Sequence, residues 1–223
     1  MIAPAIHQIE AELAGRARLV AVTKTKPVAL LCEAYDAGCR LFGENRVQEM
    51  ADKQPQLPAD VAWHQIGHLQ TNKVKYIAPF VALIHSVDSL KLLTEINSQA
   101  ARHNRVIDCL LQIHIADEET KFGLSPAEAE ALLNAPELAT LVNVRIVGLM
   151  GIATNTADDE QIRREFRGLK QLYDQLANVA RSASVADRVQ FSELSMGMSG
   201  DYRIALEEGS TLVRVGSAIF GSR

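Results

Sequence analysis

LVAVTKTKP, residues 19–27, decides the fold, because it predicts a buried strand that leads into a lysine-bearing turn and then a proline-initiated helix. An unbroken run of aliphatic residues is typical of a strand buried on both faces, as in a parallel sheet. No Gly-x-Gly-x-x-Gly motif follows this strand, where an open doubly wound dinucleotide-binding sheet would carry it. That absence favours a parallel barrel over the competing open sheet.

The rest of the chain repeats this strand-to-helix pattern. Apolar strand-like runs occur at residues 19–23, 41–43, 63–67, 83–86, 110–115, 145–151, 190–196 and 212–215. Helical segments between them include residues 27–38, a helix after Ser89, one capped by Ser125 and Glu128, and the amphipathic residues 158–181. This alternation predicts an α/β fold, a single (β/α)₈ TIM barrel that spans residues 1–223 as one domain, with an extra N-terminal helix at about residues 3–15.

Composition excludes several classes of protein. A formal net charge of -4 and the absence of basic blocks argue against a nucleic-acid partner. The longest uncharged apolar stretch, residues 146–153, is too short to span a membrane. The N-terminus lacks a charged segment followed by an apolar one, and the three cysteines have neither disulfide-framework nor zinc-finger spacing. We therefore expect a cytoplasmic protein with reduced cysteines and no membrane partner. For the oligomeric state, on which composition gives no information, we expect a monomer.

Lys24 is the first candidate functional residue, because it lies at the exit of the first buried strand. Partial desolvation favours the neutral amine, which can attack a carbonyl. If the strand continues, Lys26 lies on the same side, and its charge would help to keep Lys24 nucleophilic. Two solvated lysines beside a proline turn are the alternative. Lys26 is the next candidate for the same role, and Lys121 is a further amine that either lies at the surface or exchanges with Lys24.

Two small, polar stretches near the other end of the chain suit a phosphate. Residues 195–201 (SMGMSGD) and 214–217 (RVGS) follow the seventh and eighth predicted strands, where TIM barrels often bind phosphate through backbone N–H groups. Ser199 would cap a helix over residues 200–208 and supply a hydroxyl, while Gly216 and Ser217 would supply amides. One lysine and one phosphate site at the same rim indicate pyridoxal 5'-phosphate (PLP) as the cofactor.

Arg214 lies two residues before Gly216 on the eighth predicted strand, so it can point into the barrel mouth. A buried guanidinium requires an acceptor, and the pyridine nitrogen of PLP is one. Arginine keeps its proton, so the ring nitrogen would stay unprotonated and be a weaker electron sink. An ion pair of Arg214 with Glu207 or Glu208 is an equally open interpretation.

Two further motifs carry weaker indications. Asn45 follows the second strand and could reach the cofactor ring or the substrate side, although it is equally ordinary as a turn residue. His64 and His68 are four residues apart, but they lie on a strand and its loop with no carboxylate placed to complete a metal site. We therefore expect no metal.

The chain resembles the pyridoxal phosphate homeostasis protein family, also called the YggS/PROSC family, from about Leu19 to Arg223. The residues that carry the resemblance are AVTKTKP (21–27), FGEN (42–45), WHQIGHLQTNK (63–73), LSMGMS (194–199) and GSTLVRVGSAIFG (209–221). The resemblance implies a barrel related to the alanine racemase N-terminal domain, with PLP as a Schiff base on Lys24. It also implies phosphate contacts at Ser199, Gly216 and Ser217, and a ring-nitrogen contact at Arg214.

The resemblance further implies a PLP carrier that takes part in vitamin B6 homeostasis, without established catalysis, and apo PLP-dependent enzymes as partners. Racemases of this type also use a tyrosine from a second domain. None of the four tyrosines, Tyr35, Tyr76, Tyr173 and Tyr202, lies in such a domain, so we expect the cofactor to be open to solvent. A low-activity PLP-dependent amino-acid racemase and an aldolase-like lyase that acts through a barrel lysine are the alternatives.

Overall fold

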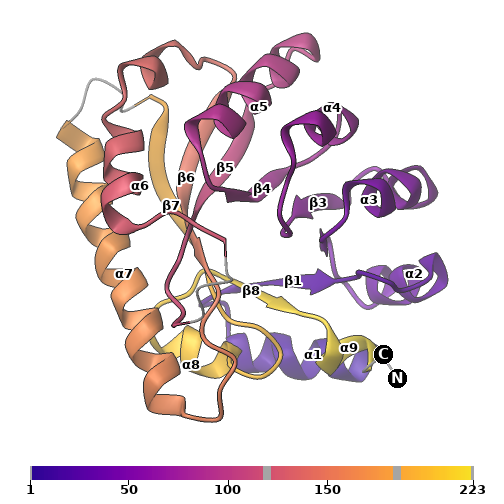
Figure 1. The fold of residues 1–223 in the computed structure, drawn as a ribbon. Coiled ribbons are helices and arrows are strands. Elements are labelled where there is room, and N and C mark those ends of the chain that lie inside the picture. The colour runs from indigo at the N-terminus through magenta and orange to yellow at the C-terminus, as the bar shows by residue number, and fades with distance from the viewer. Residues whose placement is uncertain (1, 118–121, 183–186, 222–223) are drawn as a thin grey trace.

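The computed structural model describes residues 2–117, 122–182 and 187–221, and its centre is a closed barrel of eight parallel strands in sequence order (Figure 1). The strands are β1 (Arg18–Val22), β2 (Leu41–Glu44), β3 (Ala62–Gln65), β4 (Leu83–Val87), β5 (Ile107–Ile113), β6 (Val144–Gly151), β7 (Val189–Ser195) and β8 (Leu212–Val215). The predicted (β/α)₈ barrel is confirmed. Each predicted strand overlaps an observed one.

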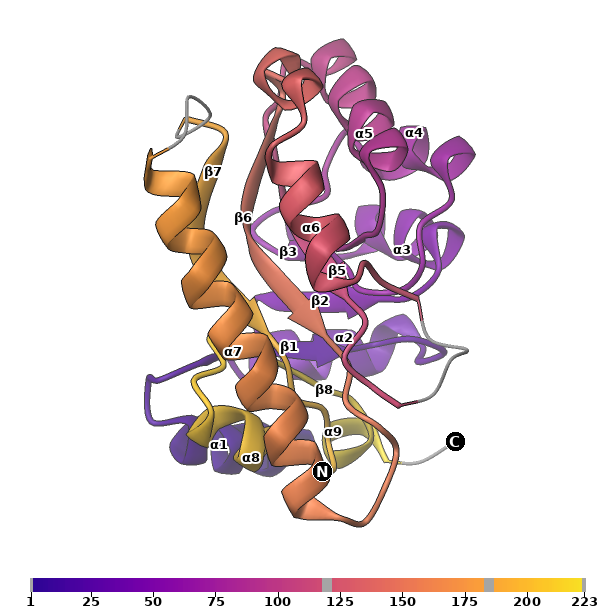
Figure 2. The same ribbon diagram turned by 60° about the vertical axis from the view of Figure 1, so that its left-hand side comes forward.

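Helices surround the strands (Figure 2). They are α1 (Ile2–Leu13), α2 (Val28–Asp36), α3 (Val47–Lys53), α4 (Val74–Ile77), α5 (Leu90–Arg102), α6 (Pro126–Leu133), α7 (Asp159–Ser182), α8 (Tyr202–Glu207) and α9 (Ser217–Phe220). Short 3₁₀ turns lie at Gln54–Gln56, Thr71–Lys73 and Pro136–Thr140. Among the described residues, no helix is both long and apolar enough to cross a membrane.

The extra helix predicted at the N-terminus is α1. Its apolar side chains, which include Ile6 and Leu13, are buried in the main core, and α1 contacts β1, α2 and α9. It therefore covers the outside of the barrel beside the last helix. The predicted capping box of α6 is also present, since Ser125 Oγ accepts from the Glu128 N–H at 3.2 Å and the Glu128 carboxylate accepts from the Ser125 N–H at 2.8 Å.

The apolar core has two parts. The larger part lies between the strands and the surrounding helices, and it contains Trp63, Phe42 and Phe166. The smaller part fills the barrel with aliphatic side chains and one methionine, namely Val20, Leu83, Leu110, Val147, Met150 and Leu212. Polar side chains are also fully enclosed, which leaves the barrel with a mixed interior.

A bulge at Gly148 bends β6 against β7. The register of both neighbouring strand pairs shifts beside this residue, and its backbone has φ +152°. A Cβ atom at Gly148 would lie 1.7 Å from the backbone oxygen of Glu193, a contact that no side chain can make without moving a strand. Glycine is therefore required for this strand pairing.

We predict opposite effects for two glycine-to-alanine substitutions. Gly148→Ala should lower the free energy of unfolding by more than about 2 kcal/mol, because the Cβ would collide with the β7 backbone. Gly168→Ala, on an open face of α7, should raise it by about 0.5–1 kcal/mol through helix propensity alone. Urea unfolding of both variants measures the difference, and a neutral Gly148→Ala would contradict the close approach of β6 to β7.

Candidate functional site

A cavity of about 420 Å³ opens where the strands end and brings together all six residues predicted as cofactor contacts. Lys24 comes from the loop after β1 and Asn45 from the loop after β2, while Ser199 follows β7. The remaining three are on β8 or directly after it: Arg214, Gly216 and Ser217. Opposite ends of the chain therefore meet at one rim, as the barrel requires.

Lys24 occupies a tight turn rather than an extended strand. β1 ends at Val22, the Lys26 N–H donates to the Thr23 oxygen at 3.0 Å, and Thr25 has φ +63°. The Lys24 side chain is half-buried and has no hydrogen bond or ion pair with any described residue. An amine in this position can react with a molecule in the cavity.

A buried network of charged side chains fixes this turn through hydrogen bonds to the two neighbours of Lys24. Lys53 Nζ donates to the Thr23 carbonyl oxygen at 2.8 Å, to Glu44 Oε1 at 2.7 Å and to Glu49 Oε1 at 2.6 Å. Thr23 Oγ1 donates to Glu44 Oε1 at 2.6 Å, and the Thr25 N–H donates to Glu49 Oε1 at 2.5 Å. Both residues that flank Lys24 are thereby fixed, so the network sets the direction in which Lys24 leaves the backbone.

Burial makes this network costly to disturb. The side chain of Glu44 is 0% exposed, and burial raises the pKa of its carboxyl group despite the hydrogen bonds from Lys53 and Thr23. Glu44 Oε2 has no hydrogen-bond partner among the described residues. A carboxylate so placed depends on Lys53 for compensation.

Lys26 does not act as a second charge beside Lys24. The alternation expected of a strand ends at Val22, and Lys26 Nζ instead donates to the carbonyl oxygens of Phe220 and Gly221, both at 3.1 Å. It lines the same cavity but is engaged with the end of α9. Lys121, the other amine considered from the sequence, lies outside the described residues.

The prediction that Ser199 caps the helix after β7 is wrong. Helix α8 begins at Tyr202 with Asp201 at the N-cap position. Asp201 Oδ1 instead accepts from the Met198 N–H in the preceding loop, at 2.5 Å. The helix therefore begins at Tyr202 rather than at the predicted residue 200. Ser199 Oγ instead accepts from the backbone N–H groups of Gly216 at 3.2 Å and Ala218 at 3.4 Å.

The contact between Ser199 and the Gly216 and Ala218 N–H groups joins the loop after β7 to the segment after β8, and together they form a polar part of the cavity wall. A Cβ atom on Gly216 would lie 3.2 Å from both the Cβ and the backbone oxygen of Val22, which is tighter than ordinary side-chain contacts. Glycine allows the β8 loop to approach β1 closely here. The N–H groups that reach the Ser199 hydroxyl, and the hydroxyl itself, are groups that suit a phosphate oxygen.

Arg214 is 4% exposed and lies at the floor of the cavity. Its Nη1 donates to Ser195 Oγ at 2.5 Å and its Nη2 to the Gly151 carbonyl oxygen at 3.0 Å. Burial lowers the pKa of the guanidinium to about 10, so the group remains charged at neutral pH. The alternative pairing is wrong, since Glu208 pairs with Arg163 and Arg167, and Glu207 with Arg163.

A hydrogen-bonded chain continues from Arg214 through the barrel interior. Ser195 Oγ is 2.9 Å from His85 Nδ1, and His85 Nε2 is 3.0 Å from His64 Nδ1. Burial lowers the pKa of His64 to about 3 and that of His85 well below its usual range, with the charge of Arg214 adding to the effect at His85. Both imidazoles are therefore neutral.

Asn45 and His68 lie beside the cavity in different ways. The Asn45 carbonyl oxygen accepts from Gln65 Nε2 at 3.0 Å, which leaves its half-buried side chain at the cavity wall. His68 stacks on Phe122 with ring centroids 4.4 Å apart and lines an adjoining cavity of about 270 Å³. His64 and His68 thus face different parts of the molecule. No group of metal-ligating side chains is found in the described part of the chain.

Sequence analysis missed the Lys53 network and the chain from Ser195 to His64. One indication was available, because His64, His85 and Ser195 are polar residues inside apolar strands and polar groups in a barrel interior require partners. Lys53 gave no such indication, since its pattern is that of an ordinary lysine at the end of a helix.

The alanine racemase N-terminal domain family matches residues 2–223 of the chain. The chain is 42% identical over 217 residues to the pyridoxal phosphate homeostasis protein of Aquifex aeolicus (strain VF5), with 95% of this chain and 91% of that protein covered. It is 39% identical over 209 residues to the protein of the same name from Escherichia coli (strain K12), with 92% and 85% covered.

Solved structures agree with this relationship. PipY of Synechococcus elongatus PCC7942, determined with PLP bound, is similar with a TM-score of 0.88 and 36% identity, covering 99% of this chain and 100% of that chain. Alanine racemase from Bartonella henselae, with covalently bound pyridoxal phosphate, has a TM-score of 0.69 and 18% identity, covering 99% of this chain and 58% of that chain. The second likeness concerns the fold alone.

We predict that Lys53→Met lowers the free energy of unfolding by about 3–5 kcal/mol, because it leaves the buried Glu44 without its cation. The matched control is Lys170→Met, which breaks an exposed pair with Asp174 and should cost less than about 1 kcal/mol. Urea unfolding of both variants provides the comparison. Equal costs for the two would mean that the network contributes no more than a surface pair.

We also predict that the protein loses stability as the pH falls below about 6.5, at pH values higher than those at which carboxylates titrate. The unfolded chain takes up protons on His64 and His85 as the pH falls below about 6.5, while the folded protein does not, so the free energy of unfolding decreases. Between pH 6.5 and 5 the loss should be about 1.5 kcal/mol for each of the two imidazoles.

NMR signals of the two imidazoles should accordingly show no titration between pH 8 and 5 in the folded protein. His85→Gln should reduce the pH dependence of unfolding in this window, because it removes one of the two imidazoles that stay neutral in the folded protein. A titration midpoint near pH 6.5 for either buried imidazole would contradict the conclusion that both rings are neutral in the folded protein.

Proposed function

The chain belongs to the pyridoxal phosphate homeostasis protein family, whose barrel is that of the alanine racemase N-terminal domain, and on this premise we propose that it binds PLP at the C-terminal rim and takes part in PLP homeostasis. The observation that carries the proposal is the meeting of Lys24, Arg214 and the Ser199–Gly216 contact at one cavity. An amine, a fixed cation and an anion-binding wall match the aldehyde, the ring nitrogen and the phosphate of PLP. When bound, the cofactor supplies an aldehyde that amines can attack.

Lys24 is the proposed anchor, through a Schiff base. Its ammonium has no partner among the described residues, and the turn that carries it is held by Lys53, Glu44 and Glu49. An amine held in one place reacts with less loss of conformational freedom than one on a mobile loop. Lys26 lines the same cavity, but its hydrogen bonds to the end of α9 make it a poor competitor.

Ser199, Gly216 and Ser217 would bind the phosphate group. The Gly216 N–H is directed at the Ser199 hydroxyl in this structure, so a phosphate oxygen could accept from the same amide while the hydroxyl rotates to donate. Asn45, which follows β2 and also lines the cavity, would contact the ring or its substituents. The cavity of about 420 Å³ is large enough for a molecule of this size.

Arg214 would hold the ring nitrogen and tune the cofactor. Its charge persists at neutral pH, and its bonds to Ser195 and Gly151 fix its plane. A guanidinium keeps its proton, so the ring nitrogen opposite it remains unprotonated and withdraws electrons weakly. This arrangement supports a carrier more than an enzyme that must stabilise a carbanion.

The composition of the cavity wall also favours a carrier over a racemase. The ionisable side chains that line it are Lys24, Lys26 and Arg214. Tyr35 and Tyr202 donate to Asp60 and Glu12 elsewhere. A second acid–base group opposite Lys24 is thus missing from the described wall, although the alternative of a low-activity amino-acid racemase stays open to test. We propose a cytoplasmic monomer that hands PLP to apo PLP-dependent enzymes.

We predict that the protein mixed with PLP gives a yellow, borohydride-reducible species, and that peptide mass mapping places the reduced adduct on Lys24. Lys24→Gln should abolish the colour. Lys26→Gln is the matched control and should keep it, because Lys26 is engaged with Phe220 and Gly221. An adduct on Lys26, or colour that survives Lys24→Gln, would contradict the assignment.

Exchange of the α-proton of amino acids in heavy water separates a carrier from a racemase. A carrier should give no exchange above the Lys24→Gln background, while free amines or apo-enzymes remove PLP from it. Exchange that requires Lys24 would favour the racemase, and PLP that neither amines nor apo-enzymes can remove would contradict delivery.

A further inference from the structure

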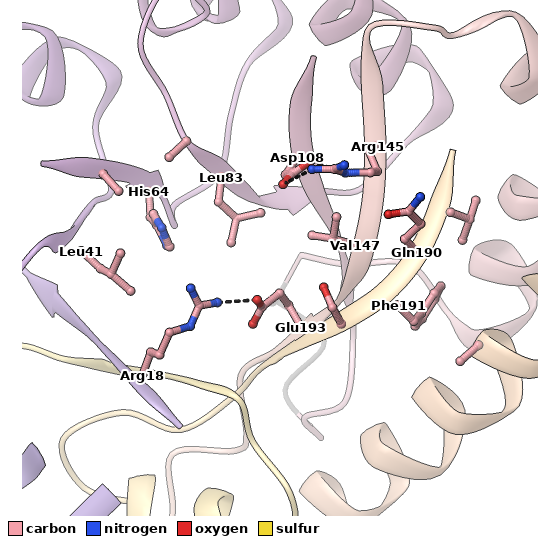
Figure 3. Close-up of a pocket in the computed structure, with 15 residues that line it drawn as sticks. Arg18, Leu41, His64, Leu83, Asp108, Arg145, Val147, Gln190, Phe191 and Glu193 are labelled. Atoms are coloured by element: carbon pink, nitrogen blue, oxygen red, sulfur yellow. Dashed lines mark hydrogen bonds and ion pairs between the residues drawn. The ribbon is translucent and has the colours of Figure 1, made fainter. Parts of the chain in front are cut away.

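A second and larger cavity, of about 650 Å³, lies at the opposite mouth of the barrel (Figure 3). Its wall includes the first residues of four strands, Arg18 of β1, Leu41 of β2, Ala62 of β3 and Leu83 of β4. The strands begin at this mouth, whereas the proposed PLP site lies where they end. The function proposed above makes no use of this cavity.

Two ion pairs lie at separate places on the wall (Figure 3). Arg18 Nη2 donates to Glu193 Oε1, and Arg145 donates through Nε and Nη2 to the two oxygens of Asp108 at 2.8 and 2.9 Å. The other Glu193 oxygen accepts from Thr211 Oγ1 at 2.8 Å. Every carboxylate oxygen in the wall therefore already accepts a hydrogen bond.

The guanidinium groups, by contrast, keep unused donors. Each guanidinium has five N–H groups, and Arg18 and Arg145 bond through them only to Glu193 and Asp108 among the described residues. Their side chains are 56% and 41% exposed, so the spare N–H groups are accessible from solvent. The unused hydrogen-bonding capacity of these pairs is thus mainly that of donors.

His64 adds a buried donor that points into the cavity (Figure 3). Arg214 can only donate to Ser195, so the Ser195 hydroxyl is satisfied when it donates to His85 Nδ1. His85 then donates from Nε2 to His64 Nδ1, which leaves the remaining proton of the neutral His64 ring on Nε2. His64 is 4% exposed, and its Nε2 has no partner among the described residues.

Apolar side chains cover other parts of the wall. Leu41, Leu83, Val147 and Phe191 line the cavity between and beside the polar groups. Gln190 and Ser192 add polar side chains that can both donate and accept, so the wall combines apolar and polar groups, as sites for small molecules do. The cavity also has the volume of such a site.

We propose that the cavity at the N-terminal mouth is a second binding site, for a small molecule that carries a carboxylate or phosphate group on an apolar body. The anionic oxygens would accept from His64 Nε2 and from the unused N–H groups of Arg18 and Arg145, while the apolar body contacts Leu83 and Val147. A cation fits less well, because the oxygens of Asp108 and Glu193 are already engaged.

The test uses benzoate and phenyl phosphate as probes, with neutral benzamide and inorganic phosphate as controls for the apolar body and the oxyanion alone. The protein is first loaded with PLP and reduced, so that phenyl phosphate cannot enter the rim cavity. Methyl signals of Leu41, Leu83 and Val147 should shift and saturate with at least one of the two probes, and shift much less with benzamide. Those of Val22 and Ile66, at the rim, should stay in place.

Arg18→Met should weaken binding of the probe at least ten-fold. Arg203→Met is the matched control, since Arg203 is an exposed arginine that pairs with Glu12 and does not line this cavity, and it should change binding less than two-fold. If only benzoate shifts the cavity methyl signals, the natural ligand carries a carboxylate, and if only phenyl phosphate does, it carries a phosphate. If both probes do, the site accepts either oxyanion.

The inference fails if neither probe shifts the cavity methyl groups, if benzamide binds as tightly as benzoate, or if only the rim signals move. It also fails if Arg18→Met and Arg203→Met behave alike. If the protein does not form the PLP adduct, the proposed function is wrong, but the methyl signals at the N-terminal mouth still decide the second site.

Discussion

The interior of this barrel depends on one constraint, the need to solvate the buried guanidinium of Arg214. A charge removed from water must be compensated by protein dipoles. Gly151 of β6 and Ser195 of β7 provide acceptors, and Ser195 in turn requires His85, which requires His64. The polar groups inside the barrel therefore form one hydrogen-bonded chain. Each donor in it, from Arg214 to Ser195 to His85, is satisfied by an acceptor on the next residue.

The two mouths of the barrel differ in which parts of the chain supply their polar groups. At the C-terminal rim, loops of irregular backbone contribute amides, a hydroxyl and the amine of Lys24, so the groups can meet around one cofactor. At the N-terminal mouth, side chains on the strands themselves form ion pairs across the wall. The rim presents backbone amides, a hydroxyl and an amine, whereas the N-terminal mouth presents guanidinium donors and His64.

Lys24 has a backbone position that is held firmly although its own amine is not engaged. Its neighbours Thr23 and Thr25 are fixed by Glu44, Glu49 and Lys53, whereas its own ammonium makes no contact with the described residues. Burial of the supporting charges costs stability, and their mutual hydrogen bonds offset it. The strained φ of Thr25 lies in the residue directly after Lys24, within the segment that these hydrogen bonds hold.

The sequence by itself determined the barrel, the order of its elements and the six residues at the rim, because strand periodicity is local and parallel closure brings all strand ends to one side. Only the tertiary structure decided that Asp201 rather than Ser199 occupies the N-cap position of α8, that Lys26 bonds to the end of α9, and that Arg214 is linked through Ser195 and His85 to His64. Those outcomes depend on contacts between residues far apart in the chain, which local pattern does not encode. Their physical basis is the demand of each buried polar group for a partner that only the closed barrel supplies.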